Sequence, residues 1–171
     1  MKLLELFCGT KSVSKNFHKA SLVHSVDIDP KFNPTFCIDI LKFDYKSIKP
    51  NTYDFIWASP PCTEFSKAKT VGIRNLTLAN KIVKKTIKII EHLNPKYFVI
   101  ENPVGLLRHQ SYMKPLEKYR NTISYCKYGY IYKKDTDLWT NIEFIPKTCR
   151  QGTRCKHFAN GVHPVTVQQS Y

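Results

Sequence analysis

Two short apolar runs constrain the fold of this chain more than any other feature. Asp54-Phe55-Ile56-Trp57-Ala58 and Tyr97-Phe98-Val99-Ile100 contain continuous apolar residues and do not alternate with polar ones. A strand with one exposed face alternates, whereas a strand of a parallel sheet that is covered on both faces does not. The two runs therefore predict strands of a buried parallel sheet.

Strand and helix patterns alternate along the rest of the chain. Val13, Phe17 and Ala20 have the spacing of one helix face, and the apolar stripe between Leu76 and Leu93 predicts the longest helix. Strands are expected at residues 2–7, 22–28, 35–40, 53–58, 97–100, 123–128 and 138–144. This order predicts an α/β protein with a mostly parallel, doubly wound sheet in residues 1–145, followed by an irregular basic tail in residues 146–171.

A thiol and a carboxylate follow the two buried runs. Cys62 lies after Ser59-Pro60-Pro61, and Glu101 begins Glu101-Asn102-Pro103. Ligands of open parallel sheets bind outside the carboxyl ends of the strands. We therefore expect a nucleophile and a proton partner on one rim of the sheet. The alternative is a buried thiol after a proline turn and a carboxylate that caps a turn.

Length and charge narrow the class of protein. A chain of 171 residues favours one domain, and no apolar stretch approaches the roughly 20 residues that span a bilayer, so we expect a soluble, intracellular protein without membrane contact. The chain has 27 Lys and Arg against 13 Asp and Glu, a formal net charge of +14. Such a surplus favours a nucleic-acid partner, although a lysine-rich composition can also reflect an AT-rich genome.

Small and acidic residues at the ends of the first three strands suggest a nucleoside site. The turn Phe7-Cys8-Gly9-Thr10 allows close backbone approach, Asp27 can hold a ribose diol, and Asp39 can accept from an exocyclic amine. Each residue alone is equally typical of an ordinary turn or cap. Their common position after successive strands favours a ligand.

These motifs, in this order, resemble the cytosine-5 DNA methyltransferases. The most specific part is Pro61-Cys62 together with Glu101-Asn102. The resemblance implies a Rossmann-like methyltransferase fold, S-adenosylmethionine as the cofactor and DNA as the substrate.

The resemblance also implies roles for particular residues. Cys62 would be the nucleophile that attacks cytosine, and Glu101 its partner at the base. The cofactor site would include Phe7, Gly9, Thr10, Asp27, Ile28, Asp39, Ile40 and Pro60, and the substrate site Ser66, Asn102 and Lys134.

The sequence departs from the family pattern in several places. Lys11 and Ser12 stand where the family has further glycines, Thr63 replaces a glutamine and Pro103 a valine. Residues 142–171 resemble neither the family's target-recognition domain nor its closing motif, which is expected of a naturally minimal form and of a shortened chain alike. We expect a monomer, with target choice slight, absent or supplied by a separate partner. An amino-group methyltransferase and a catalytically impaired DNA-binding protein remain alternatives.

The basic tail carries thiol and imidazole side chains, with Cys126 upstream of them. These groups are typical zinc ligands, and a metal could order a segment with little apolar content. The candidate ligands are Cys149, Cys155, His157 and His163. Their spacing does not match the common short Cys-x-x-Cys pattern, so unrelated cysteines and surface histidines in a DNA-contacting tail are the alternative.

Overall fold

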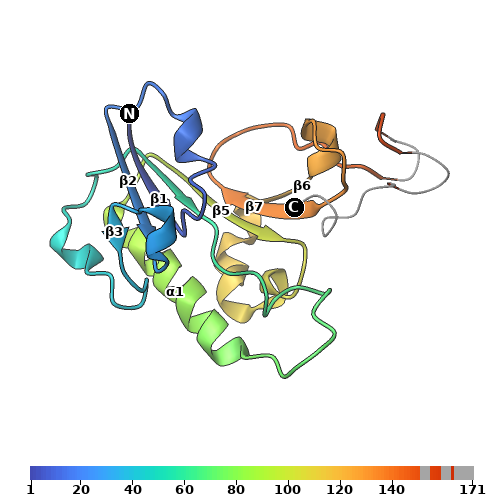
Figure 1. Cartoon of the computed structure of the whole chain (residues 1–171), viewed down its shortest axis with the longest axis horizontal. Helices are drawn as coiled ribbons and strands as arrows, with labels where there is room; N and C mark the ends of the chain where they lie inside the picture. The colour runs from blue at the N-terminus through green and yellow to red at the C-terminus, as the bar shows by residue number, and fades with distance from the viewer. Residues whose placement is uncertain (151–154, 159–162, 164–171) are drawn as a thin grey trace.

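Seven strands form one sheet in the order β3-β2-β1-β4-β5-β7-β6 (Figure 1). The computed structural model describes residues 1–150, 155–158 and 163. The strands are β1 (Lys2–Leu6), β2 (Leu22–Asp27), β3 (Phe36–Cys37), β4 (Phe55–Ala58), β5 (Tyr97–Pro103), β6 (Arg120–Ser124) and β7 (Asp135–Thr140). β1 to β5 pair in parallel, and β7 runs antiparallel to both β5 and β6. The predicted mostly parallel α/β sheet is confirmed.

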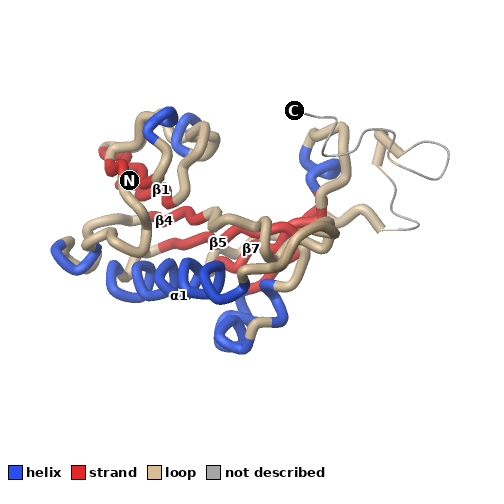
Figure 2. The backbone as a smooth tube through the Cα atoms, turned by 60° about the horizontal axis from the view of Figure 1, so that its bottom comes forward, coloured by secondary structure: helices blue, strands red, loops and turns tan. Residues whose placement is uncertain are grey.

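One long helix covers one face of the sheet. α1 (Leu76–Leu93) has the bounds that the apolar stripe predicts, and Figure 2 shows it lying along the strands. The Asn75 side chain accepts a hydrogen bond from the Leu78 N–H at 3.1 Å, and Asn94 ends the helix in the left-handed conformation. The buried stripe of α1 packs on apolar residues of β1, β4 and β5 to form the main core.

The opposite face is covered differently from what the sequence predicts. The residues expected to form an α-helix around Val13 and Phe17 contain only the 3-10 turn η1 (Ser14–Asn16). Lys11 has a left-handed backbone (φ 59°), which interrupts a helix, and the buried Glu5 carboxylate accepts the Ser14 N–H at 3.0 Å. Phe17 still covers the sheet, because its ring stacks on that of Phe55 with centroids 5.3 Å apart.

Several strand bounds also differ from the expectation. β5 extends to Pro103, because Glu101 and Asn102 pair with β7 instead of starting a turn. The second half of the strand expected at 123–128 is the 3-10 turn η6 (Tyr125–Tyr128), closed by Gly129 at φ 99°. The strand expected at 138–144 lies at 135–140, and β3 is shorter than the expected 35–40. The remaining 3-10 turns are η2 (Pro30–Phe32), η3 (Tyr45–Ser47), η4 (Leu107–His109) and η5 (Ser111–Tyr119).

Much of the tail predicted for residues 146–171 lies outside the described residues, and residues 146–150 contain neither helix nor strand. None of the helices in the described part of the chain is long and apolar enough to cross a membrane.

Candidate active site

The loop after β4 presents Cys62. Pro60 is buried, Pro61 is exposed, and Cys62 is half-buried. The N–H groups of Phe65 and Ser66 both donate to the Cys62 carbonyl at 2.9 Å, which folds the chain into a tight turn. The fully buried Phe65 side chain anchors this turn in the main core. The thiol therefore lies on a turn with a fixed backbone.

The same loop is joined to the segment that follows β5. The Leu106 N–H donates to the Phe65 carbonyl at 2.8 Å, and the Asn102 Nδ2 donates to the Pro60 carbonyl at 2.9 Å. A Cβ atom on Gly105 would lie 2.2 Å from the Phe65 carbonyl oxygen, so only glycine fits there. Asn102, which the resemblance assigns to the substrate, is buried and holds the Cys62 loop.

Glu101 lies in β5, with its side chain 12% exposed. Its Oε1 accepts a hydrogen bond from the Tyr125 hydroxyl at 3.4 Å and lies 3.7 Å from the Lys134 Nζ. Burial raises the pKa of Glu101 above its usual value, and Lys134, Tyr125 and Ser59 oppose that rise only in part. The proton affinity of this carboxyl group is thus higher than that of an exposed glutamate.

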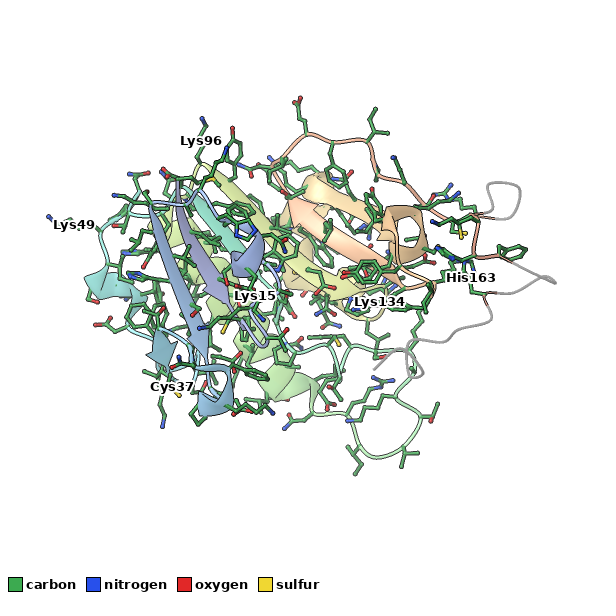
Figure 3. The ribbon with its side chains drawn as sticks, turned by 45° about the horizontal axis from the view of Figure 1, so that its top comes forward. Lys15, Cys37, Lys49, Lys96, Lys134 and His163 are labelled. Atoms are coloured by element: carbon green, nitrogen blue, oxygen red, sulfur yellow. The ribbon has the colours of Figure 1, made fainter. Side chains whose placement is uncertain are left out.

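The structure brings Cys62, Glu101 and Lys134 into one electrostatic environment. Burial raises the pKa of the Cys62 thiol, the Glu101 carboxylate raises it further, and the Lys134 ammonium lowers it. Figure 3 shows Lys134 near the middle of the molecule. The Lys134 Nζ also lies 5.0 Å from the centre of the Tyr125 ring. A thiol, an acid with raised proton affinity and a cation therefore lie together, as the positions of Cys62 and Glu101 predict.

A pocket of about 170 Å³ lies beside the ends of β1 and β2. Five residues that the resemblance assigns to the cofactor are among those that line it: Phe7, Asp27, Ile28, Asp39 and Ile40. Ile28 is 67% exposed, which leaves its surface available for a ligand.

Three of the residues assigned to the cofactor do not line this pocket. The Gly9 N–H donates to the Asp27 Oδ2 at 2.9 Å and so helps to hold that carboxylate, and Thr10 follows it in the same turn. Pro60 is buried and does not line the pocket, whereas its neighbour Pro61 does. Ile82 also lines the pocket, and the sequence gives no sign of this because Ile82 belongs to the apolar stripe of α1.

Arg74 supports the far end of the Cys62 loop and was not expected to do so. Its guanidinium donates to the carbonyls of Glu64 at 2.7 Å and of Ser66 and Lys69 at 2.9 Å. Ser66, assigned to the substrate, thus lies in a loop held by backbone-directed contacts. No local pattern marks an arginine whose partners are backbone carbonyls.

The expected metal ligands are only partly brought together. Cys149, Cys155 and His163 lie in one group, and Cys126 is its fourth member. His157 lies outside this group. Cys126 stands 23 positions before Cys149 in the chain, and the fold brings the two thiols together.

Comparison with known proteins agrees with this geometry. The model of the family described as C-5 cytosine-specific DNA methylase matches residues 1–134. The "Probable DNA (cytosine-5)-methyltransferase" of Frog virus 3 is 36% identical over 170 residues, which cover 91% of this chain and 78% of the viral protein. The type II methyltransferase M.XorII of Xanthomonas oryzae is 31% identical over 69% of this chain, but the match covers only 32% of its own length.

A solved structure shares the fold. The Dnmt2 methyltransferase of S. pombe superposes with a TM-score of 0.58 at 19% identity, covering 86% of this chain and 52% of its own. The predicted Rossmann-like methyltransferase fold is confirmed. The family match over residues 1–134, together with the viral relative, establishes that the chain belongs to the C-5 cytosine-specific DNA methylase family.

Proposed function

We propose that this chain transfers a methyl group from S-adenosylmethionine to carbon 5 of cytosine in DNA, through a covalent bond between Cys62 and the base. The observation that carries the proposal is the buried Glu101, which shares its surroundings with the Cys62 thiol and the Lys134 ammonium. A thiol beside an acid of raised pKa is what attack on a cytosine ring requires.

The residues that line the pocket beside β1 and β2 support the proposal that it holds the cofactor. The Asp27 carboxylate is held by the N–H groups of Gly9 and Asp29, so it is oriented to accept from the two ribose hydroxyls. The Asp39 Oδ1 accepts the Leu41 N–H, which fixes this carboxylate for the exocyclic amine of adenine. The exposed Ile28 would lie against the purine ring. When bound, S-adenosylmethionine supplies the electrophilic methyl group.

The reaction begins with two proton transfers, one from the Cys62 thiol and one from Glu101 to the cytosine ring. The Cys62 thiol loses its proton to solvent, and the Lys134 charge stabilises the thiolate. As the thiolate adds to carbon 6 of cytosine and forms a carbon–sulfur bond, negative charge develops at ring N3. Glu101, whose pKa is raised by burial, donates its proton to N3 and so stabilises that charge.

The addition makes carbon 5 electron-rich. Carbon 5 would form the new bond to the methyl group as the bond between that methyl group and the sulfonium sulfur breaks, with S-adenosylhomocysteine as the leaving group. The hydrogen on carbon 5 would then be lost as a proton to a base or to water. The carbon–sulfur bond breaks, its electron pair returns to Cys62, and N3 returns its proton to Glu101. Each group of the protein is restored at the end of the cycle.

DNA is proposed as the substrate because the chain has a formal net charge of +14. Neutralising phosphates releases counterions and supplies affinity that does not depend on sequence. The target base must leave the helix stack, at a cost of a few kcal/mol. We expect Lys134 and Ser66 to contact it, whereas Asn102 acts through its hydrogen bond to Pro60. A monomeric state and a separate partner that selects the target remain predictions.

The test is capture of the covalent intermediate. The protein is incubated with S-adenosylmethionine and DNA that contains 5-fluorocytosine, and intact mass is measured. Because fluorine at carbon 5 cannot leave as a proton, the adduct is expected to accumulate. Cys62→Ser should abolish it. Cys37→Ser is the matched control, because Cys37 is an exposed thiol in β3 and should leave the adduct unchanged.

Two outcomes would overturn the proposal. Methylation of ordinary DNA that survives Cys62→Ser would favour transfer to an amino group. Absence of both the adduct and cofactor binding, with DNA binding retained, would favour a DNA-binding protein without catalytic activity.

A further inference from the structure

Three thiols and one imidazole meet beyond the β6–β7 hairpin, toward the end of the molecule where Figure 3 shows His163. Cys126 belongs to η6, and Cys149 follows β7. One ligand atom from each of Cys126, Cys149, Cys155 and His163 lies within 4.8 Å of the other three. The Cys126 and Cys149 side chains are buried, and the other two are half-buried.

The distances between the ligand atoms fit tetrahedral coordination of one metal ion. The His163 Nε2 lies 3.1 Å from the Cys155 Sγ and 3.7 Å from the Cys149 Sγ. With Zn–S of about 2.3 Å and Zn–N of about 2.0–2.1 Å, tetrahedral geometry sets a sulfur-to-nitrogen separation of about 3.5 Å. The two observed distances lie on either side of that value.

We propose that Cys126, Cys149, Cys155 and His163 bind one structural Zn²⁺ ion. Three thiolates and one imidazole form a closed ligand set, typical of a zinc site that stabilises a fold and takes no part in catalysis. A disulfide would use two of the three thiols and leave the third beside it. This inference goes beyond the proposed methyl transfer and does not depend on it.

Part of the site is held in place by other contacts. The Cys149 N–H donates to the Ser124 Oγ at 2.8 Å, and the Ser124 N–H donates to the Lys147 carbonyl at 3.0 Å. These bonds fix Cys149 against the end of β6, next to η6 with Cys126. The Phe158 ring lies edge-on against His163, with centroids 5.4 Å apart. Two ligands are therefore fixed by the sheet, and the ion would bring the other two to them.

The position of the cluster suggests why a metal is useful there. Residues 141–150 contribute little to either hydrophobic core, so a metal ion can replace the missing apolar contacts. Cys126 also follows Tyr125, whose hydroxyl donates to Glu101. The ion would thus anchor the turn that supports one wall of the candidate active site.

Zinc content of the purified full chain tests the proposal. The protein is kept reduced, freed of any affinity tag and dialysed, and metal is measured by mass spectrometry. About one zinc ion per chain is expected, and Cys126→Ser and Cys149→Ser should lose it. Cys37→Ser, which changes an exposed thiol outside the cluster, should retain it. Replacement by Co²⁺ should give the charge-transfer absorption of thiolate ligands.

A second measurement uses the wild-type chain, in case the serine variants do not fold. Titration with an organomercurial should release zinc as the cluster thiols react. Removal of the ion should increase hydrogen exchange at the amides of Ser124 and Cys149. The proposal is overturned if the reconstituted chain binds neither Zn²⁺ nor Co²⁺, if both serine variants keep the metal, or if blocked thiols release none.

Discussion

Replacement of Gly105 by alanine tests whether the loop after β5 holds the Cys62 loop. The new Cβ atom would lie 2.2 Å from the Phe65 carbonyl oxygen, and real Cβ atoms essentially never approach such an atom closer than 3.0 Å. The obstacle is backbone, so no side-chain rotation relieves it. The two loops must separate by about 0.8 Å, the difference between these two distances.

The loss in the free energy of unfolding of Gly105→Ala can be estimated from the contacts that this separation disturbs. Overpacking costs about 1–3 kcal/mol. The hydrogen bond from Leu106 to Phe65 is stretched, and an unsatisfied buried group costs about 1–3 kcal/mol. The alanine recovers about 0.4–1 kcal/mol by restricting the unfolded chain. The net destabilisation is about 3 kcal/mol, which lowers the Tm of a chain of this length by about 6–12 °C.

Activity should fall further than stability alone explains. A shift of Phe65 moves the turn that presents Cys62, and a misplacement of about 1 Å can cost about 100-fold in rate. The assay compares Tm and the rate of Cys62 adduct formation at a temperature where both proteins are folded. Gly72→Ala is the control, because its positive φ costs about 1 kcal/mol with nothing within 4 Å. Wild-type Tm and rate in Gly105→Ala would refute the reasoning.

Three further changes probe the charges around the site. Lys134→Gln removes the cation that lowers the pKa of Cys62, so the pH midpoint of Cys62 alkylation, followed by peptide mass, should rise; an unchanged midpoint would contradict this. Burial raises the pKa of Glu101, so the wild-type fold loses stability as pH rises through that pKa, whereas Glu101→Gln does not. In urea unfolding the variant should therefore be more stable than the wild type above that pKa and gain nothing below about pH 4. Arg108→Ala leaves the buried Asp137 carboxylate without its bidentate partner and should cost about 3–5 kcal/mol in the same assay, whereas a loss under 1 kcal/mol would argue against the pair.

The sequence predicted the strands of the parallel half well. The buried runs at 53–58 and 97–100 correspond to β4 and to the first part of β5, and Cys62 follows β4 as expected. Glu101 was expected after its strand but lies inside β5. That the two side chains would face a common ligand was inferred from the rim at which parallel sheets bind ligands. α1 was also predicted with correct bounds, since its apolar stripe repeats at helical spacing over 18 residues. These features depend on local periodicity and on a general rule of sheet architecture.

The remainder depends on contacts between distant segments. The extension of β5 to Pro103 requires β7 as an antiparallel partner, and a strand pairing of this kind leaves no local pattern. Tyr125 was expected inside a strand, yet η6 turns its hydroxyl toward Glu101. Likewise, no local pattern marks Gly105 as a position where the Phe65 carbonyl leaves room only for glycine.

The two halves of the candidate site are therefore supported in different ways. The cofactor half lies on the ends of β1 and β2, whose pairing and burial are part of the main core. The half that would hold the base takes Lys134 and Tyr125 from the turns beside β6 and β7. Because burial alone would leave Glu101 strongly disfavoured as a carboxylate, those two side chains set how readily it holds a proton. Fixing the β6–β7 end of the sheet is thus a requirement of the chemistry as well as of the fold.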